Sequence, residues 1–390
     1  MGIISSINKK YIWKIMKIVA LKERAKGEHR VAITPETARL FCMKGYDVFV
    51  EKNIGTSANF TDKEYEEVGA TVSAIPLEIL SDADIVLKVQ PTPLVDQYNE
   101  IEMTKKEATI IGLLSPYSNS EYLDKALSKG LSAIAMELVP RITKAQNMDV
   151  LSSQSNLAGY RAVIEASYYF DRALPMMMTA AGTVNPAKTL ILGVGVAGLQ
   201  AIATAKRLGA IVSAYDVRAA TKEQVESLGA KFIYPSEPGG DTEDSSGYAK
   251  EVTKDFADIQ ERFLSGVIDK FDIVITTAQI PGKKAPTLLT KAMVAKMHPG
   301  SVVVDMAAIS GGNVEDSSID KVIAKKGVKI IGWSNMASKI ASDSSKLYAK
   351  NLYNFLEYAI KDNKINFKDD LVEEMLIGMN GQMVNKKFKV

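Results

Sequence analysis

The chain has 390 residues, of which 46% are hydrophobic and 24% charged, and its formal net charge is +2. This length and composition suit two globular domains, and the balanced charge excludes the basic surface typical of nucleic-acid-binding proteins. The single cysteine, Cys42, excludes an internal disulfide and indicates a reducing compartment, and two histidines are too few for a zinc site of the usual kind.

The first 140 residues alternate between strand-like and helix-like segments, with a helix expected at 35–44. Short apolar runs of this kind are typical of parallel strands buried on both faces. They predict a Rossmann-like domain over residues 16–140, with strands at 17–22, 46–51, 83–89, 108–114 and 132–137. Residues 1–15 are treated as an N-terminal extension, and no signal peptide is expected because they lack a continuous apolar run.

A polar stretch, RITKAQNMDVLSS, follows at 141–153. It can be a solvated linker between two domains, or it can be a functional site. A helix is predicted from Gln154 to Leu174, because Pro175 disfavours its continuation. The three methionines at 176–178 are expected to fill core space.

A second series of strand-like runs occupies 188–194, 210–216, 271–277, 301–307 and 328–332, with helices between them, as at 221–228. The predicted fold class is therefore α/β, with two doubly wound Rossmann-like parallel-sheet domains and a cleft between them. A helix at 344–361, capped by Asp343 or Ser344, is expected to return to the first domain. Residues 340–390 then complete a discontinuous first domain, and residues 141–339 form the second. The apolar run Thr189–Ala205 is shorter than the about 20 residues of a membrane span.

The sequence GVGVAG places glycines at Gly193, Gly195 and Gly198, after a predicted strand and at the start of a predicted helix. In a dinucleotide fingerprint these glycines allow a tight turn, close approach of a pyrophosphate and close helix packing. Asp216 ends the next strand and can accept both hydroxyl hydrogen bonds of an adenosine ribose. That carboxylate favours NAD(H) over NADP(H), although Arg218 nearby is a feature that suits NADP. A glycine-rich turn without a ligand is the alternative.

Further cofactor-binding positions are expected in the same loops. The loop 276–286 follows the next strand, and ligands bind at the carboxyl ends of strands in such folds, although an ordinary connecting loop is equally compatible. The further residues assigned to the cofactor are Val196, Ala197, Val217, Arg218, Thr277, Ala278 and Gln279.

Several long motifs resemble a known family. They include MKIVALKERAKGEHRVAITPETA, PRITKAQNMDVLSSQSNLAGYRAVIEA, MMMTAAGTVNPAKTLILGVGVAGLQAIATAKRLGA and TTAQIPGKKAP. Together they resemble the NAD(H)-binding α subunit of proton-translocating NAD(P) transhydrogenases, specifically its soluble domain I, which is a separate chain where the α subunit is split. Alanine dehydrogenase is a relative. The resemblance extends from Met16 to about Lys361.

This resemblance implies an enzyme that transfers hydride directly between NADH on this chain and NADP⁺ on a partner subunit. It implies membrane-spanning partners, namely the second polypeptide of the split α subunit and the β subunit, which couple the transfer to proton translocation. It also implies a homodimer, which lies at the cytoplasmic face of the inner membrane. The helix from Gln154 can contribute to the contact between the two copies. The methionines at 176–178 are then scaffold beneath the nucleotide. Alternatives are an alanine dehydrogenase-like oxidoreductase and a non-catalytic nucleotide sensor.

The resemblance also assigns roles within the polar stretch. It matches Arg141, Gln146 and Asp149 to the family's Arg-Gln-Asp loop, and Ser152 to a neighbouring carboxamide contact. These side chains can hold and orient the nicotinamide end of NAD(H) without moving a proton. The resemblance further implies a mobile loop at 241–251 that closes over bound nucleotide through Tyr248.

The residues that an alanine dehydrogenase needs are only partly present. The carboxylate-binding arginine and lysine of that enzyme match Arg30 and Lys88. Its catalytic histidine falls near Ser115 and its catalytic aspartate near Ile309, so neither proton-transfer group is retained. Hydride transfer between two nicotinamides needs no proton donor, so the transhydrogenase interpretation is favoured, and Arg30 and Lys88 are expected to be structural.

Overall fold

The computed structural model describes residues 15–94, 99–236 and 253–388. The chain divides into two compact units. Unit 1 contains the chain up to Lys26, Arg30–Met148 and the chain from Tyr348 onward, and unit 2 contains Gly27–His29 and Asp149–Leu347. None of the helices among the described residues is long and apolar enough to cross a membrane.

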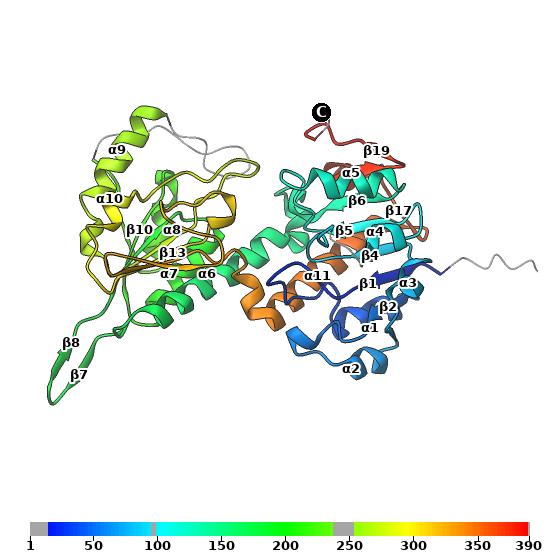
Figure 1. The fold of residues 1–390 in the computed structure, drawn as a ribbon, viewed down its shortest axis with the longest axis horizontal. Helices are drawn as coiled ribbons and strands as arrows, with labels where there is room; N and C mark the ends of the chain where they lie inside the picture. The colour runs from blue at the N-terminus through cyan, green and yellow to red at the C-terminus, as the bar shows by residue number, and fades with distance from the viewer. Residues whose placement is uncertain (1–14, 95–98, 237–252, 389–390) are drawn as a thin grey trace, which may run out of the picture. The chain divides into compact units, whose positions relative to one another are not determined.

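Unit 1 is built on an eight-stranded sheet of order β19-β18-β6-β5-β4-β1-β2-β3 (Figure 1). Six strands are parallel, namely β1 (Lys17–Ala20), β2 (Asp47–Glu51), β3 (Thr71–Ser73), β4 (Ile85–Leu87), β5 (Thr109–Gly112) and β6 (Ser132–Ala135). The antiparallel strands β18 (Leu376–Met379) and β19 (Gln382–Met383) extend the sheet beyond β6. The chain order reverses between β1 and β4, and ligands bind at such switch points in doubly wound folds.

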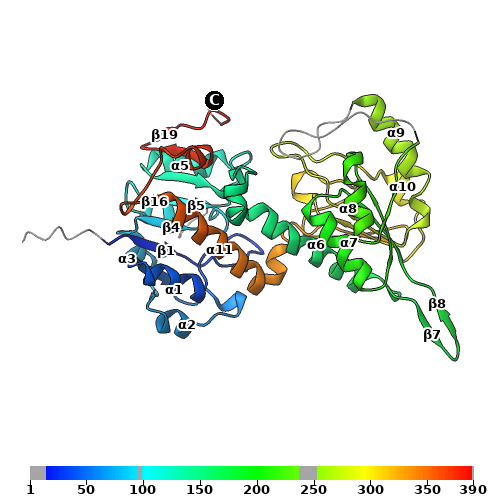
Figure 2. The same ribbon diagram turned by 180° about the vertical axis from the view of Figure 1, so that it is seen from behind.

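The helices of unit 1 cover its sheet because their apolar faces need burial. The first of them begins where Thr34 and Thr37 form a reciprocal capping box and Pro35 supplies the first helical residue. The helices are α1 (Pro35–Met43), α2 (Asp62–Glu67), α3 (Pro76–Leu80), α4 (Glu100–Met103), α5 (Ser120–Ser128), α12 (Asp370–Met375) and the C-terminal portion of α11 (Ala341–Ala359), which is seen in Figure 2.

Unit 2 is built on a seven-stranded sheet of order β11-β10-β9-β12-β13-β15-β14. All are parallel except β14, and the strands are β9 (Lys188–Leu192), β10 (Ile211–Tyr215), β11 (Lys231–Phe232), β12 (Ile273–Thr276), β13 (Val302–Asp305), β14 (Val322–Lys325) and β15 (Val328–Ile331). Its helices are α6 (Val150–Tyr169), α7 (Val196–Arg207), α8 (Lys222–Ser227), α9 (Lys254–Ser265) and α10 (Lys291–Val294). Here the chain order reverses between β9 and β12.

Every predicted strand is present, and the α/β class with two parallel Rossmann-like sheets is confirmed. The predicted bounds of α6, Gln154 and Leu174, are wrong at both ends, since the helix spans Val150–Tyr169. The helix begins at Val150 because the Asp149 side chain accepts a hydrogen bond from the Ser152 amide and caps it. The predicted cap of α11 at Asp343 or Ser344 is also wrong, since a 3₁₀ turn at Ala337–Ile340 leads directly into Ala341.

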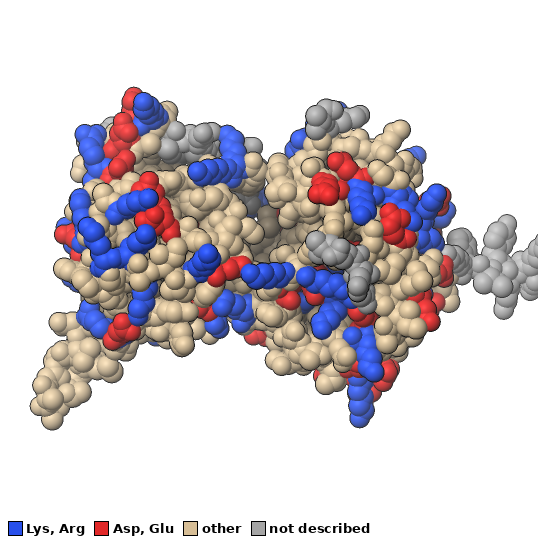
Figure 3. Space-filling view, in the orientation of Figure 1, with Lys and Arg blue, Asp and Glu red and all other residues tan. Residues whose placement is uncertain are grey.

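The prediction that the three methionines fill the core is wrong. They lie at a two-stranded antiparallel hairpin, β7 (Met177–Thr179) and β8 (Gly182–Val184), which projects from unit 2 and carries no Lys, Arg, Asp or Glu (Figures 1 and 3). Met176 is 60% exposed and Met178 is 79% exposed. Gly182, at φ +135°, occupies a backbone region that favours glycine, and the Thr179 hydroxyl donates to its carbonyl. The β7–β8 hairpin and the residue before it therefore expose apolar side chains on the surface of unit 2.

Candidate functional site

The glycine-rich loop of unit 2 joins β9 to α7 and can be formed only with glycine at two of its positions. Gly193 has φ +97°, and a Cβ there would lie 2.6 Å from the Thr277 hydroxyl. A Cβ at Gly198 would lie 1.9 Å from the carbonyl oxygen of Gly193. Both contacts are far inside van der Waals distance, so any side chain at these two positions would push α7 away from β9 and β12.

The third glycine of the loop leaves room for a ligand. A Cβ at Gly195 would have no heavy atom within 4 Å. Gly195 is the N-cap of α7, and no side chain caps that helix. The amides of Val196 and Ala197 in the first helical turn are thus placed where helix N-termini bind phosphate groups. Close packing at Gly193 and Gly198 with open space at Gly195 fits a dinucleotide pyrophosphate.

Asp216, directly after β10, is held in place from two sides. Its carboxylate is largely buried, and it accepts a 2.6 Å hydrogen bond from the Val194 amide of the glycine-rich loop. The Arg218 guanidinium donates to both carboxylate oxygens at 2.9 Å, and the Arg218 amide also donates to one of them. A ribose diol that binds Asp216 therefore has to share the carboxylate with Arg218 or displace it. Val217, between these two residues in the sequence, is partly buried and packs against the hydrophobic core of unit 2.

Three loops at the carboxyl ends of β9, β12 and β13 are joined by hydrogen bonds. The Thr277 hydroxyl donates to the Gly193 carbonyl at 3.0 Å. The Ala278 amide donates to the Asn313 side chain at 3.1 Å, and the Gln279 side chain donates to the Met306 carbonyl at 3.0 Å. The predicted residues 277–279 thus lie beside the glycine-rich loop at the switch point of the sheet.

The β13 loop depends on an aspartate that was not singled out from the sequence. Asp305 is fully buried, and its carboxylate accepts hydrogen bonds from the amides of Ala307, Asn313 and Val314. The sequence clue was an acidic residue at the end of an apolar strand, which must be hydrogen-bonded if it is buried. At the tip of the same loop, the Ile309 side chain is 62% exposed.

The Arg-Gln-Asp stretch is distributed over two kinds of local structure. Arg141 and Gln146 are exposed residues of unit 1, and Gln146 lies in a 3₁₀ turn at Thr143–Met148. Asp149 and Ser152 belong to unit 2, where the Ser152 hydroxyl donates to the Asp149 carboxylate at 2.6 Å and the Ser152 amide donates at 2.9 Å. The structure thus brings Asp149 and Ser152 together at the start of α6. Tyr248 lies outside the described residues.

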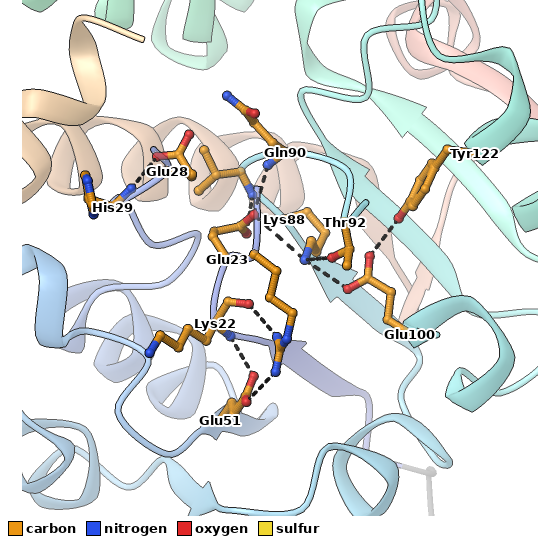
Figure 4. Close-up of polar contacts among 12 residues, drawn as sticks. Lys22, Glu23, Glu28, His29, Glu51, Lys88, Gln90, Thr92, Glu100 and Tyr122 are labelled. Atoms are coloured by element: carbon orange, nitrogen blue, oxygen red, sulfur yellow. Dashed lines mark hydrogen bonds and ion pairs between the residues drawn. The ribbon is translucent and has the colours of Figure 1, made fainter. Parts of the chain in front are cut away.

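Lys88 has its anionic partners within unit 1 (Figure 4). Its ammonium is fully buried, 2.9 Å from a Glu100 oxygen and 3.8 Å from a Glu23 oxygen. It also donates to the Thr92 hydroxyl at 2.9 Å, while the other Glu100 oxygen accepts from Tyr122. Burial acts to lower the pKa of Lys88, but the two carboxylates outweigh burial and raise it.

Arg30 also belongs to this buried region of unit 1. It is 4% exposed, and its guanidinium carbon lies 5.9 Å from the centre of the Tyr348 ring. The Tyr348 hydroxyl donates to the carbonyl of Lys88 at 2.7 Å. These contacts, with the internal carboxylates around Lys88, place both cations in the packing of unit 1, and their structural role stays a prediction.

Ser115, at the position where a proton-transferring histidine was sought, is an exposed residue with φ +53°. Its amide and that of Leu114 donate to the carboxylate of Glu137, after β6. Burial raises the pKa of Glu137 to about 7, although the amide hydrogen bonds act in the opposite direction. The sequence reasoning did not identify Glu137.

Comparisons with known proteins agree with this arrangement. Residues 19–158 match the model of the alanine dehydrogenase/PNT N-terminal domain, and residues 162–386 match that of the C-terminal domain. The chain is 62% identical over 370 residues to a Rickettsia prowazekii protein named as the first part of NAD(P) transhydrogenase subunit alpha, covering 95% of this chain and 96% of that one. It is 49% identical over 376 residues to the protein of the same name from Rhodospirillum rubrum, covering 95% of this chain and 98% of that one.

A solved structure described as transhydrogenase from Sinorhizobium meliloti superimposes with a TM-score of 0.84 at 47% identity, covering 94% of this chain and all of that one. The family matches together span most of the chain, and the relatives are covered over nearly their full length. The chain therefore belongs to the alanine dehydrogenase/PNT family.

Proposed function

We propose that this chain is the NAD(H)-binding catalytic component of a proton-translocating NAD(P) transhydrogenase. Hydride passes directly between NADH on this chain and NADP⁺ on a partner subunit, and membrane-spanning subunits couple the transfer to proton movement. The near full-length similarity to two proteins named as the first part of NAD(P) transhydrogenase subunit alpha supports this assignment.

In this function the loops of unit 2 bind the adenine half of the dinucleotide. The amides of Val196 and Ala197 bind the pyrophosphate beside Gly195, where the absence of a side chain leaves space. Asp216 accepts hydrogen bonds from the adenosine ribose, and Arg218 adjusts to release one or both carboxylate oxygens. Bound NADH supplies the hydride.

The nicotinamide end is assigned to the polar stretch. Arg141 binds the carboxamide or pyrophosphate oxygens, and Gln146 bonds the nicotinamide ribose and contacts the partner's nucleotide. Asp149 and Ser152 orient the carboxamide, since Asp149 can accept from an amide nitrogen while it caps α6. Thr277, Ala278 and Gln279 flank the glycine-rich loop, and Tyr248 is assigned to a closing loop.

The side chains at positions 115 and 309 favour direct hydride transfer over amino-acid oxidation. A serine and an isoleucine stand where alanine dehydrogenase needs a histidine and an aspartate, so neither position can transfer the proton of that reaction. Lys88, which a substrate carboxylate would need, is fully buried against Glu100. Transfer between two nicotinamides requires only that the rings be held in contact with water excluded.

Reconstitution tests this function. The purified chain is mixed with the NADP(H)-binding domain of a transhydrogenase, and hydride transfer from NADH to an NAD⁺ analogue is followed in the presence of NADP(H). Transfer that depends on both proteins is expected. No transfer, together with pyruvate- and ammonia-dependent oxidation of NADH by the chain alone, would instead establish an alanine dehydrogenase.

We also propose that two copies of the chain form a dimer through unit 2, and that the dimer binds peripherally to its membrane partners at the cytoplasmic face. The uncharged β7–β8 hairpin exposes Met176 and Met178, and the outer face of α6 exposes Tyr160 by 41% and Tyr168 by 80%. Apolar surfaces of this kind favour a protein partner. Sedimentation equilibrium should give twice the chain mass, and Met178→Ser should shift the equilibrium towards the monomer.

A further inference from the structure

Gly159 of α6 lies directly against the first turn of α7. A Cβ at Gly159 would lie 2.1 Å from the carbonyl oxygen of Ala197 and 3.0 Å from its Cα. These are backbone atoms, so they cannot rotate away as a flexible side chain could. Gly159 therefore lets the two helix backbones approach more closely than any other residue would permit.

The contact lies at the end of α7 that faces the pyrophosphate. Ala197 is the second residue of α7, and its amide is one of those assigned to the phosphate groups. Ala162 and Ala166 of α6 and Ala201 of α7 are buried in the hydrophobic core of unit 2. Toward the start of α6, the Asn156 side chain donates to Gln200 of α7 at 3.3 Å.

The same helix begins at the residues assigned to the nicotinamide. Asp149 caps α6 and bonds Ser152, and Gly159 follows ten positions after Asp149, which is roughly 15 Å along a helix at 1.5 Å per residue. One rigid helix thus carries Asp149 and Ser152 at its start and meets the phosphate-binding turn at Gly159. A displacement at this contact changes the spacing between the two ends of the site within unit 2.

We propose that Gly159 is a positioning residue for hydride transfer. It sets the distance between the pyrophosphate-binding amides of α7 and the side chains of Asp149 and Ser152, and so fixes where the nicotinamide ring lies relative to the anchored phosphates. The role rests on the proposed function, because it presupposes that NAD(H) binds to these loops.

Gly159→Ala tests the role by adding one methyl group at the contact. Alanine favours a helix more than glycine does, so a loss of affinity or rate cannot come from a weakened helix. Adenosine, which reaches Asp216 without the phosphate-binding turn, should bind within about twofold of wild type. ADP-ribose should bind about tenfold or more weakly, and hydride transfer at saturating NADH should fall further still.

Ala162→Gly is the matched control in the same helix, because it removes a buried methyl group and adds no atom against α7. It should lower thermal stability through helix propensity while the ratio of adenosine to ADP-ribose affinity stays at the wild-type value. If Gly159→Ala weakens adenosine and ADP-ribose in proportion, or leaves both unchanged, Gly159 has only a packing role and the proposal is wrong.

A measurement on the wild-type chain covers the case in which Gly159→Ala does not fold. ADP-ribose, but not adenosine, should slow hydrogen exchange of the α6 amides around Gly159, because only ADP-ribose fixes the first turn of α7. Equal protection by both ligands, or by neither, contradicts the proposal. A wild-type chain that binds no NADH would refute the proposed function itself, whereas normal NADH binding and transfer without these differences refutes the role of Gly159 alone.

Discussion

The ammonium of Lys88 lies 2.9 Å from a carboxylate oxygen of Glu100, and neither side chain is more than 4% exposed. Removing one member of a buried ion pair costs about 3–5 kcal/mol, and without Glu100 the Lys88 ammonium keeps only the more distant Glu23 carboxylate, at 3.8 Å, among the carboxylates described above. We expect Glu100→Ala to lower the free energy of unfolding by this amount in urea denaturation. NADH binding by the folded fraction should stay close to wild type.

The exposed pair of Lys129 and Glu102 provides the comparison, since its two side chains are 24% and 54% exposed at a distance of 3.0 Å. Lys129→Ala should cost less than about 1 kcal/mol. The double change Lys88→Met with Glu100→Leu should recover part of the loss, because the pair is removed together, while the buried Glu23 carboxylate keeps its hydrogen bonds from the amides of Val89 and Gln90. A cost for Glu100→Ala no larger than that for Lys129→Ala would show that the buried pair is not holding unit 1 together.

Gln146→Asn shortens an exposed side chain in the 3₁₀ turn at Thr143–Met148 by one methylene. We expect hydride transfer in the reconstituted system to slow by about tenfold or more, with NADH affinity changed by less than about threefold, because small misplacements affect transfer more than binding. Stopped-flow transfer rates and NADH fluorescence titrations separate the two. Asn147→Ala is the control, since its backbone carbonyl, which accepts from Asn351 and Asn354, is retained. Affinity and rate falling together would make Gln146 a binding residue.

Asp149 combines a helix cap with an assigned cofactor contact, and two substitutions separate these roles. Asparagine caps helices about as well as aspartate, so Asp149→Asn should keep the wild-type melting temperature, whereas Asp149→Ala should lose about 1 kcal/mol. If Asp149 also orients the carboxamide, both variants should slow hydride transfer. If Asp149→Asn transfers hydride at the wild-type rate, Asp149 serves only as the N-cap of α6.

Glu137 gives stability a pH dependence of defined sign. Burial raises its folded pKa to about 7 from an ordinary value of 4.5, so the folded chain binds this proton more tightly than the unfolded chain does. The stabilisation of the folded state by Glu137 is therefore complete below the pKa of this residue in the unfolded chain, and it is lost as pH rises through about 7. We expect the free energy of unfolding to fall between about pH 5 and pH 8 by an amount that is missing in Glu137→Gln.

Glu66→Gln, a change at an exposed glutamate of α2, should keep the wild-type slope of stability against pH. Denaturation curves at several pH values compare the three chains directly. Coincident slopes for wild type and Glu137→Gln would mean that Glu137 does not titrate in this range.

The parallel strands could be predicted because strands buried on both faces must be apolar throughout, and such runs are visible in a single sequence. The start of α6 could be predicted too, since an aspartate such as Asp149 directly before a helical segment is a favoured N-cap. In both cases the information is local, so the sequence contains it.

The hairpin and the buried charges could not be predicted in this way. Met176 and Met178 show only that the segment is apolar, and the surface that an apolar segment faces is decided by tertiary structure or by a partner. Lys88 within an apolar run suggests a buried ammonium, yet no local pattern marks Glu100, 12 residues later at the start of α4, as its partner. The position of Asp305 at the end of an apolar strand indicates a need for hydrogen bonds, but the backbone amides that Asp305 and Glu137 bind carry no sequence signature of their own.

In the loop after β13, the residues that fix the path of the backbone differ from the residue that is exposed at the tip. Its path is determined at its base, where the carboxylate of Asp305 binds three amides and where a Cβ at Gly312 would lie 2.8 Å from that carboxylate. The exposed side chain at its tip, Ile309, takes no part in that framework. Replacing Ile309 with an acidic residue should therefore change the free energy of unfolding by only about 0.5 kcal/mol, as is typical of surface substitutions. The chemical group that this loop presents can thus change, by evolution or by engineering, while the fold stays the same.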